Sequence, residues 1–159
     1  TLPLQPLQVV LGKYGAALLY YGLILAGSLP IVAMLAWLGA PDLGLIFCGY
    51  LGALLLGALF LAFGQFLSSL THNQIVAFAL AALLASGLVF SGHPQVVEVM
   101  DGLWPAWQPG TVVAEALSCL PQYEAFVSGL IGLDHILYFV LMSVLFLWLT
   151  QVGLRRIQY

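Results

Sequence analysis

Histidine and cysteine are the residue types in this sequence that could bind a metal ion or carry redox chemistry. His93 and His135 could together hold a metal ion or haem, and His135 directly follows Asp134. No histidine pair has helical i, i+4 spacing, and no cysteine or second acid stands at ligand spacing. Solvated loop histidines are the favoured interpretation, so we expect no metal site, and a metal or redox protein stays open as a hypothesis.

The two cysteines, Cys48 and Cys119, also lack metal-ligand spacing. A disulfide between them is conceivable in an oxidising periplasm, because both fall on the outer side in the topology predicted below. Cys48 lies within an apolar run, which favours two separate buried thiols.

Motifs for hydrolysis or nucleotide binding are missing from the sequence. It contains no H-E-x-x-H, no G-x-S-x-G and no phosphate-binding G-x-x-x-x-G-K-[ST]. We therefore expect that the chain is not an enzyme, and that any ATP chemistry belongs to another polypeptide.

The segment Leu43 to Leu70 carries no charged residue, and we expect the rest of the chain to be arranged around it. A helix of this length is roughly 42 Å long at ~1.5 Å per residue, more than a ~30 Å hydrocarbon layer requires. Hydrophobic residues make up 63% of the chain and charged residues 6%, far below the roughly 25% charged of a soluble domain. The sequence predicts an all-α integral membrane protein whose partner is the lipid bilayer, and the lack of a basic patch argues against nucleic acid.

Breaks in the apolar pattern predict four transmembrane helices and two short outer interfacial helices. Pro30 predicts a bend near Ala26. Thr71 and Gln74 have capping-box spacing at the start of the third span. The predicted division is a cytoplasmic arm (1–13), spans at 14–39, 43–70, 74–91 and 135–154, and an outer segment (92–133) with short helices either side of Pro121.

The charges give this topology an orientation. Lys13, Arg155 and Arg156 fall on one side together with the Thr71–Asn73 turn, and this basic side should be cytoplasmic. No ionisable Asp, Glu, Lys or Arg lies at mid-depth in a predicted span, which argues against an ion-coupled pump. All six acids fall on the outer side: Asp42, Glu98, Asp101, Glu115, Glu124 and Asp134.

Small residues recur at intervals of four along the second predicted span. Such spacing allows another backbone to approach closely in lipid, although glycine is also tolerated in any membrane helix. Both interpretations stay open for these positions: Gly49, Ala53, Gly57, Gly64 and Ser68.

Polar side chains are rare in the predicted spans. Gln65 could bond across helices or lie near the headgroups. Tyr14, Tyr20 and Tyr21 are better suited to packing and an interfacial belt than to a ligand cage.

Three stretches, in order along the chain, resemble ABC-2 type exporter permeases. The nearest branch is the gliding-motility type, often described alongside nitrous-oxide-locus permeases. The stretches resemble, in turn, the segment between the coupling helix and the third span, the inner turn between spans four and five, and the outer segment before the last span: TLPLQPLQVVLGKYGA (1–16), FLSSLTHNQIVAF (66–78) and LPQYEAFVSGLIGLDHILYF (120–139).

The resemblance implies the carboxy-terminal part of a six-span subunit in a bacterial inner membrane. The chain begins at Thr1 without Met, and we expect it to be cut from a longer protein. Such a subunit pairs with a second permease copy or paralogue and with cytoplasmic ATPase subunits, which hold the ATP and Mg, so no cofactor is expected on this chain. His72 departs from the family pattern, in which an acid is expected.

Specific roles follow from the same resemblance. The expected outer gate comprises Pro121, Tyr123, Glu124, Gly129 and Asp134. The expected ATPase-coupling contacts are Leu2, Pro3, Leu4, Gln5, Lys13, Thr71, His72 and Asn73. A rival hypothesis is a non-transporting membrane scaffold that anchors an outer-side complex through 92–133.

Overall fold

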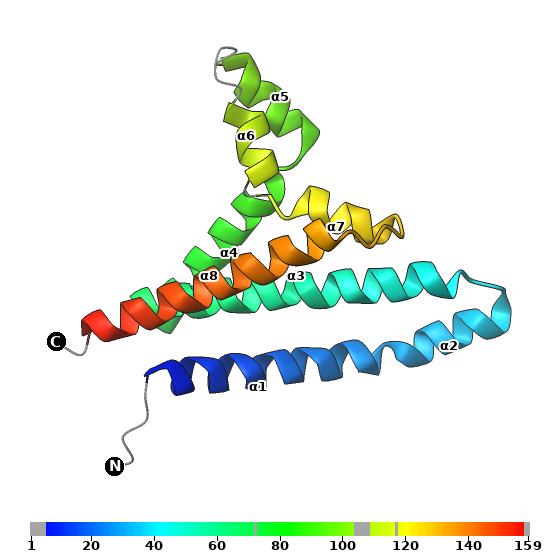
Figure 1. Ribbon diagram of the computed structural model, residues 1–159, viewed down its shortest axis with the longest axis horizontal. Helices are drawn as coiled ribbons and strands as arrows, with labels where there is room; N and C mark the ends of the chain where they lie inside the picture. The colour runs from blue at the N-terminus through cyan, green and yellow to red at the C-terminus, as the bar shows by residue number, and fades with distance from the viewer. Residues whose placement is uncertain (1–5, 72, 104–108, 117, 158–159) are drawn as a thin grey trace.

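The computed structural model describes residues 6–71, 73–103, 109–116 and 118–157, and the regular elements in these ranges are all α-helices (Figure 1). Three segments of this part of the chain are long and apolar enough to cross a membrane: Leu7–Leu38, Leu43–Leu70 and Leu133–Leu154. The chain is therefore a membrane protein with several spans, as the sequence predicts.

The third predicted span (74–91) corresponds to α4 (Gln74–Phe90), which has 17 residues. At ~1.5 Å per residue it is roughly 25 Å long, shorter than a ~30 Å hydrocarbon layer. It passes as a span by length and composition only together with α5 (Pro94–Leu103), and the two helices bend by 83° at the break between them. The predicted count of four spans and two short outer helices is thus not confirmed.

The first span is built from two helices, α1 (Pro6–Gly27) and α2 (Leu29–Leu38). Helix α1 begins eight residues before the predicted start of the span at Tyr14, so the second half of the predicted arm is helical. Proline suits a first helical position, where its missing N–H leaves no hydrogen bond unmade. The helix breaks at Ser28, between α1 and α2, because Pro30 cannot donate to the carbonyl of Ala26 and its ring would clash with it. This break lies close to the bend predicted near Ala26, and Leu7–Leu38 is still one candidate span.

The central helix α3 (Leu43–Leu70) has the predicted bounds. The side chain of Asp42 accepts a hydrogen bond from the Gly44 N–H at 2.9 Å and so caps its N-terminus. Helix α4 is capped by Asn73, whose side chain accepts from the Ile75 N–H at 3.0 Å. The hydroxyl of Thr71 instead donates to the Leu67 carbonyl, so the capping box expected from Thr71 and Gln74 is not formed.

The outer segment contains three short helices in its described residues, where two were predicted. They are α5, α6 (Pro109–Ala116) and α7 (Leu120–Val127). Pro121 lies in the first turn of α7 rather than between two helices. The last helix, α8 (Leu133–Ile157), begins two residues before its predicted start and extends three residues beyond its predicted end.

Helix α3 lies at the centre and packs against α1, α4, α7 and α8. Figure 1 shows α1, α3 and α8 running lengthwise beside one another, with α5 and α6 projecting from the far end of α4. A buried cluster joins three of these elements: Leu59, Cys119, Phe126 and Phe139. Phe126 and Phe139 stack with ring centroids 6.2 Å apart, which fixes α7 against α8.

Candidate functional site

A cavity of about 470 Å³ opens between α1, α2, α3 and α7. This volume lies in the roughly 300–1,000 Å³ range of small-molecule sites. Most of its lining is aliphatic, and its polar side chains are Ser28, Tyr50 and Tyr123. We call it the outer cavity, because it lies along the first half of α3, which begins on the predicted outer side. Its chemistry suits an apolar ligand with one hydrogen-bonding group.

The break between α1 and α2 supplies the polar edge of the outer cavity. Ser28 is the residue at the break, and its hydroxyl lies 2.7 Å from the Leu25 carbonyl and 2.5 Å from the Tyr50 hydroxyl. Because these two hydroxyls bond each other, they need no ligand to be satisfied in an apolar environment.

Four side-chain hydrogen bonds join α1 and the α1–α2 break to α3, and we call them the α1–α3 ladder. They are Gln65 Nε2 to the Val10 carbonyl at 3.0 Å, Tyr14 hydroxyl to the Ala58 carbonyl at 3.1 Å, Tyr21 hydroxyl to the Ala53 carbonyl at 2.9 Å, and Ser28 with Tyr50. The ladder runs from one end of the antiparallel helix pair to the outer cavity. Gln65 thus bonds across helices, and Tyr14 and Tyr21 serve packing.

The small residues of α3 differ in what they face. A Cβ at Gly57 would lie 2.2 Å from the Tyr21 ring, so the glycine lets this ring approach. Nothing lies within 4 Å of the Cβ positions of Gly49 and Gly64. Gly52, outside the predicted seam, would place a Cβ 2.7 Å from the Cβ of Phe126. Gly57 and Gly52 therefore leave room for side chains of α1 and α7, whereas Gly49 and Gly64 have no such neighbour.

The expected gate residues on α7 have different surroundings. Tyr123 lines the outer cavity, whereas Glu124 and Pro121 are exposed. Phe126, two residues after Glu124, is fully buried. Helix α7 is therefore anchored through one ring and presents Tyr123 to the cavity.

The turn after α7 is held against α3. Gly129 has φ 81°, a conformation that favours glycine. Its carbonyl lies 3.8 Å from the Sγ of Cys48, which fits a weak S–H donor. The expected gate residue Gly129 thus has a clear backbone role.

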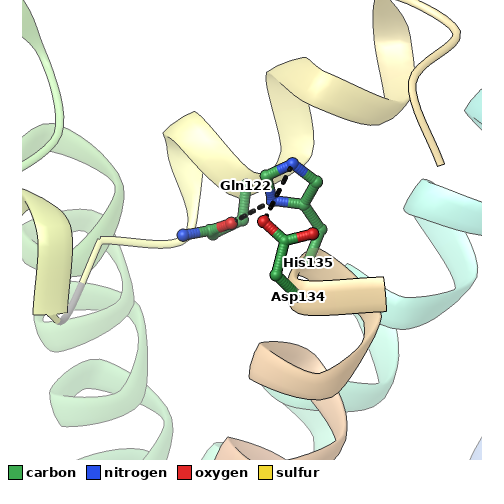
Figure 2. Close-up of polar contacts among 3 residues, drawn as sticks. All are labelled: Gln122, Asp134 and His135. Carbon is green, nitrogen blue, oxygen red and sulfur yellow. Dashed lines mark hydrogen bonds and ion pairs between the residues drawn. The ribbon is translucent and has the colours of Figure 1, made fainter. Parts of the chain in front are cut away.

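Figure 2 shows the polar contacts where α7 meets α8. His135 Nδ1 hydrogen-bonds Gln122 Oε1, and His135 Nε2 lies 3.8 Å from Asp134 Oδ2. The hydrogen bond between the Gln122 amide and the His135 ring therefore joins α7 to the start of α8. Asp134 is 78% exposed and His135 24%, so the expected gate acid faces outward.

Among the described residues, no group of three or more His, Cys, Asp or Glu side chains is placed to hold a metal ion. His93 lies in the turn between α4 and α5, and the metal or redox hypothesis stays a prediction. Cys48 and Cys119 are buried and unbonded, as two separate thiols. Burial raises the pKa of the Cys119 thiol, so this thiol stays protonated at neutral pH.

A smaller cavity of about 160 Å³ lies near the other end of α3, which we call the inner cavity. Its lining comes from α1, α3 and α8: Val9, Val10, Lys13, Gln65, Ser68, Ser69, Thr150 and Leu154. Of the expected coupling contacts, Lys13 lines this cavity, whereas Thr71 and Asn73 do not. Leu2, Pro3, Leu4, Gln5 and His72 lie outside the described residues.

Asp101 has a structural role that the sequence analysis missed. Its carboxylate accepts from the Gly110 N–H at 2.7 Å, the Thr111 N–H at 3.2 Å and the Thr111 hydroxyl at 2.5 Å. The Thr111 hydroxyl bond lowers the pKa of Asp101 most, against a smaller opposing effect of burial, and the two N–H groups add to the lowering. Asp101 thus caps α6 from α5, and a Cβ at Gly110 would lie 2.5 Å from the Val97 carbonyl.

Comparisons with protein-family models, curated proteins and solved structures found no match to this chain.

Proposed function

We propose that this chain is the transmembrane permease subunit of an ABC-2 type ATP-driven exporter in a bacterial inner membrane. The proposal counts α4 as a fourth span, which leaves α5, α6 and α7 on the outer side. It draws on the three stretches that resemble such permeases and on the separation of bases from acids along the chain. ATP and Mg would be held by a cytoplasmic ATPase subunit, and a second permease copy or paralogue would complete the pathway.

The observation that carries the proposal is the α1–α3 ladder. Its innermost bond, Gln65 to Val10, borders the inner cavity that Lys13 also lines. Its outermost bond, Ser28 with Tyr50, borders the outer cavity. Helices joined at four levels move as one body, so a displacement applied by an ATPase at the inner end would reach the outer cavity.

The outer cavity supports a lipid-like or amphipathic cargo. Its described lining is aliphatic apart from three hydroxyl-bearing side chains, and it contains no Asp, Glu, Lys or Arg. An apolar chain could enter this space without leaving a buried charge unpaired. Tyr123 on α7 would then be the gate residue in contact with cargo.

The first experiment is co-purification of the full-length protein with its ATPase. Thr71→Ala and Asn73→Ala change the inner turn, and Ser86→Ala on the exposed face of α4 is the control, because Ser86 bonds only its own helix. We expect the ATPase to co-purify with the control and to be depleted with the turn variants. A protein that purifies without any ATPase, or turn variants that bind it like the control, would overturn the proposal.

One observation favours the scaffold as a second candidate. The α5–α6 pair projects from the bundle (Figure 1) and is held together by Asp101. It exposes Val99, Leu103 and Val112 to the surroundings, as a docking platform would. If cells tolerate loss of the ATPase but not deletion of this pair, the scaffold function is supported over transport.

A further inference from the structure

Lys13 is a cation without a protein counter-charge in the inner cavity. The described residues that line this cavity include no carboxylate, and no ion pair joins Lys13 to a described acid. All six acids of the chain stand on the opposite side in the predicted topology. Lys13 is exposed although it lines this cavity, and a lysine near an anionic membrane surface attracts anionic headgroups.

Among the other polar groups of the inner cavity, some hydrogen-bond donors are already used and others are free. The Ser69 and Thr150 hydroxyls each donate to their own helix, at 2.6 Å to Phe66 and 2.7 Å to Phe146. Gln65 donates one amide N–H to the Val10 carbonyl, and its second amide N–H remains free to donate.

The hydroxyl of Ser68 bonds no other described residue, and it lines the same cavity. The free donors are therefore the Ser68 hydroxyl, the second N–H of Gln65 and the three N–H groups of Lys13, while the oxygens of Ser69 and Thr150 remain as acceptors. These donors match the oxygen atoms of an anion.

We propose that the inner cavity binds the phosphate of an anionic phospholipid headgroup from the cytoplasmic leaflet. Its volume of about 160 Å³ is far above the roughly 10–15 Å³ that one water requires, so it has room for a group larger than a single water. Basic pockets between membrane helices on the cytoplasmic side are suited to such headgroups. This site goes beyond transport, since it requires only that this end of the helices faces the inner leaflet.

The surroundings of the cavity select a lipid over free phosphate. Val9 and Leu154 line it beside the polar groups, and Leu7 and Leu11 on α1 are exposed apolar side chains near the same end. The headgroup would therefore sit where the polar lining meets hydrocarbon, with its acyl chains along α1. Free phosphate would gain nothing from these apolar side chains.

The test is lipid binding by the purified full-length protein in neutral detergent, without any ATPase. Native mass spectrometry and the shift in unfolding temperature are measured with added phosphatidylglycerol, phosphatidylcholine or inorganic phosphate. The variants are Lys13→Gln, Lys13→Arg and Ser68→Ala, with Ser86→Ala as a matched serine control outside the cavity.

We expect phosphatidylglycerol to bind and to raise the unfolding temperature more than phosphatidylcholine does. Lys13→Gln should weaken this binding about fivefold, the change expected for one Lys near an anionic lipid surface, and Lys13→Arg should preserve it. If Lys13→Gln fails to fold, the same measurements on the other two variants test the site. Ser68→Ala should then weaken phosphatidylglycerol binding, and Lys13→Arg should preserve it.

Three results would overturn the site. They are equal binding of the two phospholipids, unchanged binding in both Lys13→Gln and Ser68→Ala, and a shift that inorganic phosphate alone reproduces. Because no ATPase is present, failure here leaves the transport proposal standing, and a failed co-purification leaves this site standing.

Discussion

The contact between Gly52 of α3 and Phe126 of α7 yields a sharp prediction about stability. A Cβ at position 52 would lie 2.7 Å from the Phe126 Cβ and 3.1 Å from its Cγ. The Cβ of Phe126 is fixed to the α7 backbone, so rotation of the ring cannot relieve the contact. Gly52→Ala therefore requires α7 to shift away from α3.

The magnitude follows from two opposing effects. Overpacking of this kind costs about 1–3 kcal/mol, and replacing glycine by alanine within a helix returns about 0.8–1.0 kcal/mol. Gly64→Ala has the same helical gain, and nothing lies within 4 Å of its Cβ position. The difference between the two variants therefore isolates the contact with Phe126, and we expect Gly52→Ala to be less stable by about 1–3 kcal/mol.

Reversible unfolding of both variants in mixed micelles, followed by helical circular dichroism, measures this difference. Gly49→Ala is a second control, because its Cβ position is equally open. Equal stability of Gly52→Ala and both controls would refute the packing of α7 on α3. A control that weakens the protein only in the presence of a second permease would instead reveal an interface at Gly49 or Gly64.

Three further predictions concern hydrogen bonds. Asp101 has a lowered pKa when folded, so its stabilisation of the α5–α6 pair is present above the unfolded pKa and is lost as pH falls through the folded one. The protection of the 109–116 amides against hydrogen exchange, relative to the intrinsic exchange rate at each pH, should therefore fall on acidification. Asp101→Asn should remove this pH dependence. Gln65→Leu should cost about 0.6 kcal/mol, the mean for such bonds in membranes, measured by the same unfolding assay. Asn73→Ala should destabilise the start of α4 by about 1 kcal/mol, because it removes the N-cap. Thr71→Ala removes no cap and should destabilise α4 less. Hydrogen exchange of the α4 amides measures both effects.

The parts of the fold that sequence predicts are those set by local chemistry. The bounds of α3 follow from an uncharged run with Asp42 before it, and the break after Gly27 follows from Pro30. The error at the start of α1 has a local cause too, because Pro6 could equally end an arm or begin a helix.

The missed features depend on contacts between distant segments. Spacing of small residues identifies a face of α3, but it cannot tell that α7 reaches Gly52 while Gly64 stays open. Asp101 caps a helix that begins eight residues later in the chain. A Pro-Gly-Thr start without a local capping side chain was the available signal for a cap supplied from elsewhere.

The inner and outer cavities differ in their chemistry, and the difference agrees with the membrane orientation predicted from the charged residues. The inner cavity contains Lys13 and free donors, and it lies at the end that the predicted topology assigns to the cytoplasmic side. The outer cavity has no charged side chain in its described lining, so an apolar group could leave it toward the outer leaflet without breaking an ion pair. An anionic headgroup bound near Lys13 would therefore add a contact at the inner end of the α1–α3 pair, and the ladder would link that end to the apolar outer cavity.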